Sequence, residues 1–200
     1  AGLQTDLRGW EWRYLWQQCR SAELCTLGGF PSAVTGVAFS PDSTKLAAGD
    51  VGGNLKIWQL PSLRLESESH PGDGINSLAF SPDGQQLLIA HYYRRGVDLW
   101  SVAERRVVTT LRPKSADWPH HMAAFSPSGN RIAIINDDSR FEVWDTRALT
   151  NLVSLAGPKT CVIGVEWSPD GRWIVSGEQR DLLWLRDANT FERRFEWPCP

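Results

Sequence analysis

The 200-residue sequence is poor in the residue types that carry metals, cross-links or catalysis. It contains one methionine, four histidines and four cysteines. The cysteines form no Cys-x-x-Cys pair and are too sparse for a disulfide scaffold, so we expect reduced thiols. The histidines, two of them adjacent at positions 120 and 121, lack the spacing of a zinc site. The sequence therefore predicts neither a structural metal nor a cofactor.

Several classes of function are excluded by other absences. The formal net charge is -2, which gives no basic excess for nucleic-acid binding. No apolar stretch approaches the roughly 20 residues that span a bilayer, and no charged start precedes an apolar signal core, so we expect no direct membrane insertion. Glycine-rich phosphate loops, nucleophile elbows and metalloprotease helices are also missing. We therefore expect a globular, noncatalytic protein.

What the sequence does contain is a repeat. Phe-Ser-Pro-Asp occurs at 39–42 and 80–83, Phe-Ser-Pro-Ser at 125–128 and Trp-Ser-Pro-Asp at 167–170. The prolines of this phrase recur every 41 to 45 residues, and a period of about 40 to 45 with short strands is typical of propeller blades. Proline presets one backbone angle, serine and aspartate hydrogen-bond locally, and the glycine that usually follows accepts a left-handed conformation. Each phrase is therefore predicted to close a hairpin.

A tryptophan follows each turn at a similar distance. Three segments alternate apolar and polar residues, as strands do, before ending in tryptophan: 55–58, 97–100 and 141–144. The fourth segment, 181–184, lacks the alternation, and Trp184 lies 15 residues after the turn proline rather than 17 or 18. We therefore expect a shortened loop before this strand.

These patterns predict an all-β propeller array over residues 22–200, as part of a larger ring. It comprises a lone outer strand at 22–27 and four complete four-stranded blades, at about 33–69, 74–111, 120–155 and 160–197. Residues 1–21 are predicted to form a helical lead-in. One face of this short helix carries Trp12, Leu15, Trp16 and Cys19, which we expect to cap blade edges rather than to bind a ligand.

The turn phrase, the strand tryptophans and the intact Trp144-Asp145 dipeptide resemble WD repeats over residues 22–200. The resemblance implies a β-propeller that binds other proteins. The Gly-His pair that opens such repeats appears only as Gly29-Phe30 and Gly157-Pro158, and the usual turn aspartate only as Asp138. We therefore expect the family's His, Asp, Ser and Trp network to be missing and apolar packing to hold the blades.

The lead-in at 6–16 resembles a segment that precedes the propeller in large bacterial WD-repeat proteins, many of which carry an upstream serine/threonine kinase. The resemblance implies a scaffold or sensing platform within a larger signalling protein. An alternative stays open, because Trp-Ser-Pro-Asp-Gly at 167–171 also resembles repeats of Tol-type and peptidase-associated propellers, which assist a transport system or a hydrolase. The location is cytoplasmic by default, or outside the cytoplasm if a membrane span precedes this segment.

One pair of loops combines aromatic and basic residues. In a propeller, the loop at 91–96 and the connection at 112–121 lie on the same face, at adjacent positions. Their composition is that of an interaction hot spot and predicts binding of an acidic or aromatic protein segment. The candidate residues are Tyr92, Tyr93, Arg94, Arg95, Arg112, Lys114, Trp118, His120 and His121. The competing interpretation is that Trp118 folds onto the blade edge while the arginines are solvated.

Two further expectations follow from the repeat. Asp42, Asp83 and Asp170 occupy the same turn position in separate blades, so we interpret them as turn formers rather than calcium ligands or catalytic acids. The chain begins at Ala1 without methionine, which suggests an internal fragment or a processed product. The open ends of a four-blade array would expose apolar blade surface, so the isolated chain is expected to self-associate.

Overall fold

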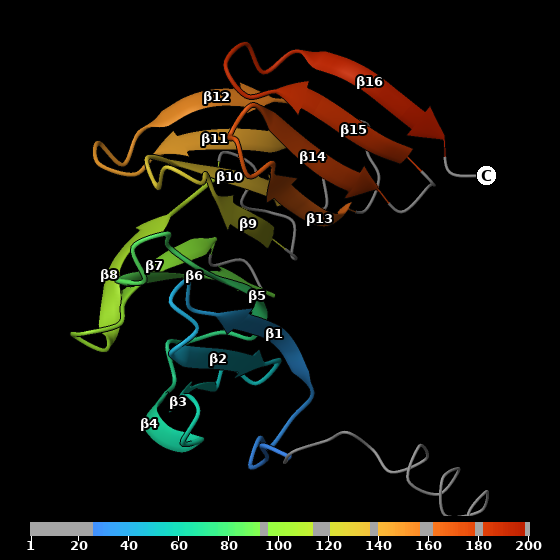
Figure 1. The fold of residues 1–200 in the computed structure, drawn as a ribbon. Coiled ribbons are helices and arrows are strands. Elements are labelled where there is room, and N and C mark those ends of the chain that lie inside the picture. The colour runs from blue at the N-terminus through green and yellow to red at the C-terminus, as the bar shows by residue number, and fades with distance from the viewer. Residues whose placement is uncertain are drawn as a thin grey trace, which may run out of the picture.

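The computed structural model describes residues 26–92, 96–113, 121–136, 140–156, 162–178 and 182–198. Within these ranges the chain forms strands β1 to β16 and no helix (Figure 1). The predicted helical lead-in at 1–21, and most of the predicted lone strand at 22–27, lie outside the described residues. Thr26 and Leu27, the last two residues of that lone strand, are not in a strand.

The strands form four separate antiparallel sheets, each built from consecutive strands. Blade 1 contains β1 (Val34–Phe39), β2 (Lys45–Asp50), β3 (Leu55–Gln59) and β4 (Arg64–Ser69). Blade 2 contains β5 (Ile75–Phe80), β6 (Gln86–His91), β7 (Val97–Ser101) and β8 (Arg106–Leu111). Blade 3 contains β9 (His121–Phe125), β10 (Arg131–Asn136), β11 (Phe141–Asp145) and β12 (Asn151–Leu155). Blade 4 contains β13 (Val162–Trp167), β14 (Trp173–Glu178), β15 (Leu182–Asp187) and β16 (Arg193–Pro198).

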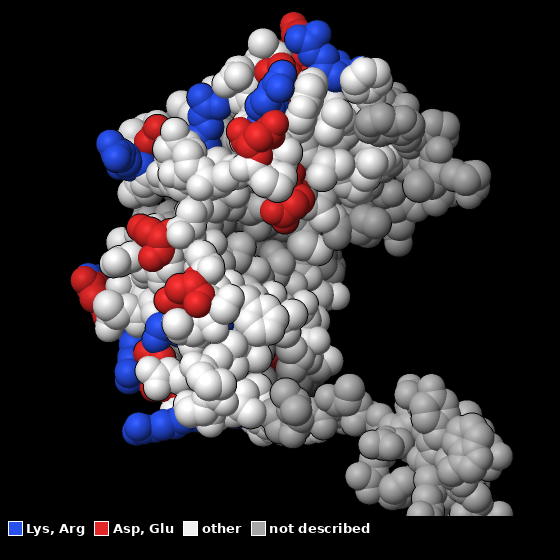
Figure 2. Space-filling view, in the orientation of Figure 1, with Lys and Arg blue, Asp and Glu red and all other residues white. Residues whose placement is uncertain are grey.

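The four blades stand side by side in an arc. The first strand of each blade contacts the first strand of the next, so that β1, β5, β9 and β13 line the concave side (Figure 1). The fourth strands lie toward the convex side, where most of the charged side chains visible in Figure 2 are found. This arrangement confirms the predicted fold class.

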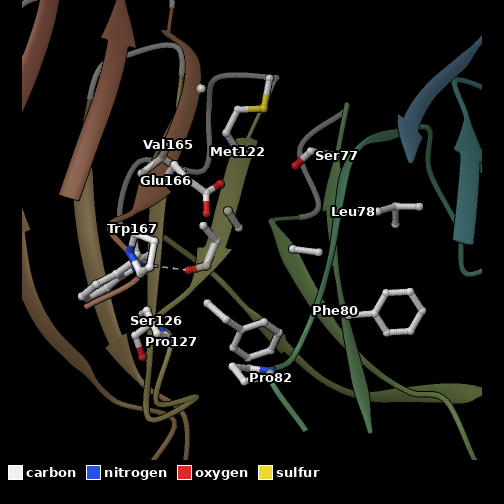
Figure 3. Close-up of a pocket in the computed structure, with 16 residues that line it drawn as sticks. Ser77, Leu78, Phe80, Pro82, Met122, Ser126, Pro127, Val165, Glu166 and Trp167 are labelled. Carbon is white, nitrogen blue, oxygen red and sulfur yellow. Dashed lines mark hydrogen bonds between the residues drawn. The ribbon is translucent and has the colours of Figure 1, made fainter. Parts of the chain in front are cut away.

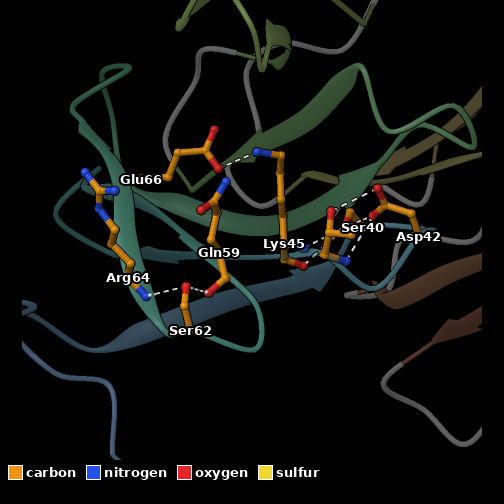
Figure 4. Close-up of polar contacts among 8 residues, drawn as sticks. Ser40, Asp42, Lys45, Gln59, Ser62, Arg64 and Glu66 are labelled. Carbon is orange, nitrogen blue, oxygen red and sulfur yellow. Dashed lines mark hydrogen bonds and ion pairs between the residues drawn. The ribbon is translucent and has the colours of Figure 1, made fainter.

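The turn phrase closes the first hairpin of each blade as predicted, and Figure 4 shows the turn of blade 1. In blade 1, Ser40 Oγ donates to Asp42 Oδ1 at 2.6 Å and accepts from the Lys45 backbone N–H at 2.8 Å. Asp42 Oδ1 also accepts from the Thr44 N–H at 3.0 Å. These bonds stabilise the carboxylate, so the Ser40 hydroxyl, followed by the Thr44 groups, lowers the pKa of Asp42 from 3.8 to about 2.

The same turn geometry recurs in the other blades. Backbone N–H groups five residues later donate to the turn serines Ser81, Ser126 and Ser168. Hydrogen bonds from Ser81 and Ser168 also hold the pKa of Asp83 and of Asp170 below the usual value. The interpretation of these aspartates as turn formers is confirmed.

Apolar clusters join each blade to the next. Between blades 1 and 2, Leu55 and Ile57 of β3 pack against Phe80, Leu87 and Trp100. Equivalent clusters join blade 2 to blade 3 and blade 3 to blade 4. In blades 1 to 3, residues of the second and third strands therefore pack against the following blade.

The register of blade 4 differs from the prediction. Trp58, Trp100 and Trp144 lie opposite Leu46, Leu87 and Ile132 of the second strands. Ile174 has the same position in the second strand of blade 4, and the residue opposite it is Arg186. Arg186 lies 17 residues after the turn proline, as in blades 1 and 3, so the loop is not shortened. The tryptophan at 184 is two residues earlier in the strand. The expectations of a shortened loop and of an equivalent final tryptophan in blade 4 are therefore wrong.

The polar residues of the third strands are buried. Lys56, Asp98 and Glu142 occupy one strand position in blades 1 to 3, opposite Ala48, Ile89 and Ile134. Trp184 takes this position in blade 4, opposite Ser176. A period of two in polarity therefore does not mark a solvated face here, because both faces of these sheets meet other parts of the molecule.

Each of these buried charges has hydrogen-bonding partners within its own blade. Glu142 accepts from Trp144 Nε1 at 3.0 Å, from Asn151 at 2.8 Å and from Ser154 at 2.9 Å. Lys56 Nζ lies 3.2 Å from Glu68 Oε1 on β4, and it also donates to the Gly29 carbonyl before β1 at 2.8 Å. The expectation that apolar packing alone holds the blades is therefore wrong.

Candidate interaction surface

A groove of about 410 Å³ lies on the concave side, across the first strands of blades 2, 3 and 4 (Figure 3). Its lining comes from β5, β9, β13 and the turns that follow them. Leu78 and Phe80 turn toward blade 1, so small residues such as Ala79 and Gly164 leave the backbone accessible from the groove. The groove is open rather than enclosed, which suits an extended segment better than a small molecule.

Three side chains give the groove its chemistry. Glu166 is exposed and directs its carboxylate toward the open space, and Ser77 and Met122 are half-buried on neighbouring strands. Among the described residues that line the groove, Glu166 is the one charged side chain. A segment that lies in the groove would therefore meet a flexible apolar side chain and a single negative charge.

The first strands also offer backbone groups. Each has a neighbouring strand on one edge only, because β5, β9 and β13 stand at the ends of their sheets. Some of these edge groups bond to side chains of a neighbouring blade: Trp167 Nε1 of blade 4 donates to the Ala124 carbonyl of blade 3 at 3.2 Å, and Thr35 Oγ1 of blade 1 donates to the Ile75 carbonyl of blade 2. Free strand edges can pair with the main chain of an extended peptide.

A second, more polar groove of about 650 Å³ separates the turns of blades 2 and 3. Its lining includes Asp83, Gln85, Asn130 and Arg147. The two turns lie close together, since a Cβ added at Gly129 would lie 3.5 Å from Pro82 Cδ. The hydrogen bonds within the turns fix the backbone there. We therefore interpret this groove as a gap between adjacent turns and not as a binding site.

The predicted loop site is only partly described. Tyr93, Arg94, Arg95, Lys114, Trp118 and His120 lie outside the described residues, and for His121 only the backbone is described, at the start of β9. Tyr92 is half-buried and Arg112 is exposed. They follow β6 and β8, which end on one face of blade 2, as the prediction requires. The site as a whole stays a prediction.

Tyr92 is held by the connection between blades 1 and 2. Its backbone N–H donates to the Gly74 carbonyl at 2.6 Å. Next to it, His91 is fully buried, with Nδ1 3.0 Å from the Asp73 carbonyl oxygen and Nε2 2.9 Å from Asp98 Oδ2. Thr110 Oγ1 donates to the other oxygen of Asp98 at 2.6 Å. This cluster fixes the base of the predicted loop site.

The cluster around His91 could not be recognised in the sequence. Its members come from three strands and one connection, at positions 73, 91, 98 and 110. The signal in the sequence was Asp98, a polar residue between the apolar Val97 and Leu99 of a short predicted strand. In the part of the chain that the structure describes, no group of three or more His, Cys, Asp or Glu side chains could hold a metal ion.

Four-stranded antiparallel sheets arranged in an arc, with consecutive strands in each sheet, define the β-propeller class. The family model of the WD domain, G-beta repeat, matches residues 21–59, 62–101 and 149–182, which is more than half of the chain. The chain therefore belongs to the WD-repeat family. Among the residues that the structure describes, there is no helix long and apolar enough to cross a membrane.

Relatives from bacteria and eukaryotes share this sequence pattern. A WD repeat-containing protein of Synechocystis sp. is 31% identical over 157 residues, which is 76% of this chain and 43% of the relative. Pre-mRNA-processing factor 19 of rice is 29% identical, covering 72% of this chain and 28% of the relative. Human angio-associated migratory cell protein is 26% identical, covering 82% and 37%. The chain thus spans less than half the length of each of these relatives.

Proposed function

We propose that this chain is a noncatalytic platform that binds a segment of another protein. The observation that carries the proposal is the open groove of about 410 Å³ across three blades, where free strand edges lie beside apolar side chains. Repeat folds provide extended concave surfaces of this kind, and a peptide can add main-chain hydrogen bonds to an exposed strand edge. Membership of the WD-repeat family supports a platform over the Tol-type alternative.

The chemistry of the groove indicates the kind of segment. Glu166 would pair with a lysine or arginine, while Met122 would contact an apolar side chain. The loop site with Tyr92 and Arg112 is a second contact region in this proposal, with the opposite preference for acidic or aromatic residues. We further propose that the platform belongs to a larger bacterial signalling protein, which the resemblance of the lead-in at 6–16 supports.

A displayed library of random peptides tests the groove. Peptides selected on the chain should carry a basic residue, and Glu166→Lys should weaken their binding about tenfold or more in calorimetric titration, because it replaces attraction by repulsion. Glu104→Lys, at an exposed carboxylate in the β7–β8 turn, should leave the affinity unchanged. Selection of peptides whose affinity is the same for both variants would contradict a site in the groove.

The loop site is tested with acidic or aromatic peptides selected from the same library. Tyr92→Ala and Arg112→Ala should weaken acidic or aromatic peptides several-fold, because they remove contact area and a charge. Arg64→Ala, at an exposed arginine of β4, is the matched control. If neither variant differs from the control, the loop residues are solvated surface, as in the competing interpretation.

A further inference from the structure

The junction of blades 3 and 4 contains a pocket that shares no residue with the concave groove or with the loop site. Its volume is about 320 Å³. One wall is apolar and comes from the end of blade 3, with Val153, Leu155 and Ala156. The other wall comes from blade 4 and carries Arg186 and Arg193, so we call this site the arginine pocket. Because it lies between two adjacent blades, it would also be present within a larger ring.

The two arginines lie directly opposite each other in the sheet of blade 4. Arg186 of β15 and Arg193 of β16 are partners across the two strands. At this position the other blades pair a tryptophan with an uncharged residue: Trp58 with Leu65, Trp100 with Val107 and Trp144 with Asn151. Like charges directly opposite each other in a sheet are destabilising. A cationic pair where the repeat accepts an uncharged one therefore points to a role other than folding.

Aromatic rings cover one side of each guanidinium group. The Cζ atom of Arg193 lies 3.5 Å from the centroid of the Trp184 ring, and Arg186 lies over Phe141. A guanidinium that stacks on a ring keeps its N–H groups in its own plane, where two of them can bind one carboxylate. Arg193 is exposed, so a ligand can reach these groups. Arg186 is buried beside the pocket and contributes its charge.

The carboxylates near the pocket have partners of their own. Glu192, which also lines the pocket, lies 3.8 Å from Arg194 Nη2. Asp187 accepts two backbone N–H groups of its own turn. A further positive charge lies close by, because the Cζ atom of Arg131 is 5.7 Å from the ring of Phe191 in the pocket wall. These charges favour an anionic ligand.

We propose that the arginine pocket binds an acidic segment of another protein, in which a carboxylate lies next to an aliphatic or aromatic side chain. The carboxylate would pair with Arg193, in the positive potential to which Arg186 adds. The neighbouring side chain would pack on Val153 and Leu155, which are half-buried. An inorganic anion would leave this apolar wall unused, so charge complementarity and apolar contact together favour a protein segment.

Selection of displayed random peptides on the 200-residue chain, with depletion on the Arg193→Glu variant, tests the proposal. The retained peptides should contain aspartate or glutamate next to an aliphatic or aromatic residue. In calorimetric titration of these peptides, Arg193→Glu should weaken binding about tenfold or more, because repulsion replaces attraction. Arg193→Lys should weaken it less, because lysine keeps the charge but lacks the planar fork. Arg106→Glu, the same change at an exposed arginine of β8, is the matched control and should leave the affinity unchanged.

A charge exchange and a second control make the test specific to this pocket. A peptide in which lysine replaces the carboxylate should bind the Arg193→Glu chain more tightly than the parent. Arg112→Ala, in the loop site, should not change the affinity of the retained peptides. Circular dichroism and urea unfolding establish that each variant is folded.

Three results would overturn the proposal. The first is a selection that yields no peptide able to distinguish the parent from Arg193→Glu. The second is a set of retained peptides without a carboxylate. The third is an equal loss of affinity in Arg106→Glu or in Arg112→Ala, which would place the binding elsewhere on the chain.

Discussion

Arg186 lies over the ring of Phe141, with its Cζ atom 4.8 Å from the ring centroid. This contact joins blade 4 to blade 3 at the position where Trp100 and Trp144 join their blades to the preceding ones. Arg186 Nη1 also donates to the Phe191 carbonyl at 3.4 Å. Arg186 thus takes the position that tryptophan has in blades 2 and 3. It joins the blades through a cation–π contact and through packing of its aliphatic stem.

Replacing Arg186 should therefore destabilise the junction of blades 3 and 4. Arg186→Ala is expected to lower the free energy of unfolding by about 2–3 kcal/mol, because a buried side chain and its contact with Phe141 are lost. Urea unfolding measures the change, with Arg64→Ala as an exposed control that should stay within about 0.5 kcal/mol of the parent. A loss equal to that of the control would mean that the contact does not stabilise the junction.

The first turn offers a stabilising substitution. Ser43 has a φ of 58°, the left-handed conformation that Gly84, Gly129 and Gly171 adopt in the other three turns. Glycine takes this conformation without the steric cost that serine has, so Ser43→Gly should raise the free energy of unfolding by about 0.5–1 kcal/mol. Gly84→Ser is the reciprocal variant and should lower it by a similar amount. Changes of the same sign in both variants would contradict this explanation.

The turn aspartates predict a loss of stability in acid. The pKa of Asp42 falls from 3.8 in a free side chain to about 2 in the fold, mainly through the Ser40 hydroxyl. A group whose folded pKa is lowered contributes stability that is present above pH 4 and disappears as the pH falls through the folded value. We expect Asp42→Asn to unfold with a weaker pH dependence than the parent between about pH 4 and pH 2.

Blade 3 supplies the control for this pH effect, because its turn carries Ser128 in place of the aspartate. Ser128→Asp places a carboxylate beside the Ser126 hydroxyl and should steepen the pH dependence over the same range. Chemical unfolding at a series of pH values measures both variants. Parallel curves for Asp42→Asn and the parent would show that the turn bonds do not contribute.

The buried cluster in blade 2 predicts a larger effect. Asp98→Ala removes the carboxylate that His91 and Thr110 contact in a fully buried place, so we expect a loss of about 3–5 kcal/mol in the free energy of unfolding. Glu192→Ala, at an exposed carboxylate, should change it by less than about 0.5 kcal/mol. If Asp98→Ala does not fold, Thr110→Val removes one hydrogen bond and should cost about 1–3 kcal/mol. Losses below 1 kcal/mol in these variants would contradict a stabilising role.

Local patterns predicted the strands closely. The predicted strand segments 55–58, 97–100 and 141–144 are β3, β7 and β11, and each of these strands ends one residue later than predicted. This agreement has a local cause, since the turn serine of each phrase accepts a bond from the backbone five residues later and so fixes the turn locally. The candidate loop site was harder to predict, because it depends on connections of which only Tyr92, Arg112 and the backbone of His121 are described.

The sequence by itself determined the repeat, the turns, the strand order and the family, because these depend on residues close together in the chain. The tertiary structure decided which residues of each strand meet another blade. It placed Arg186 rather than Trp184 at the strand position of Trp100 and Trp144, over Phe141 of blade 3, and it buried Asp98 and Glu142 among partners from other strands. Register and burial depend on contacts between distant segments, which the polarity of a strand alone does not specify.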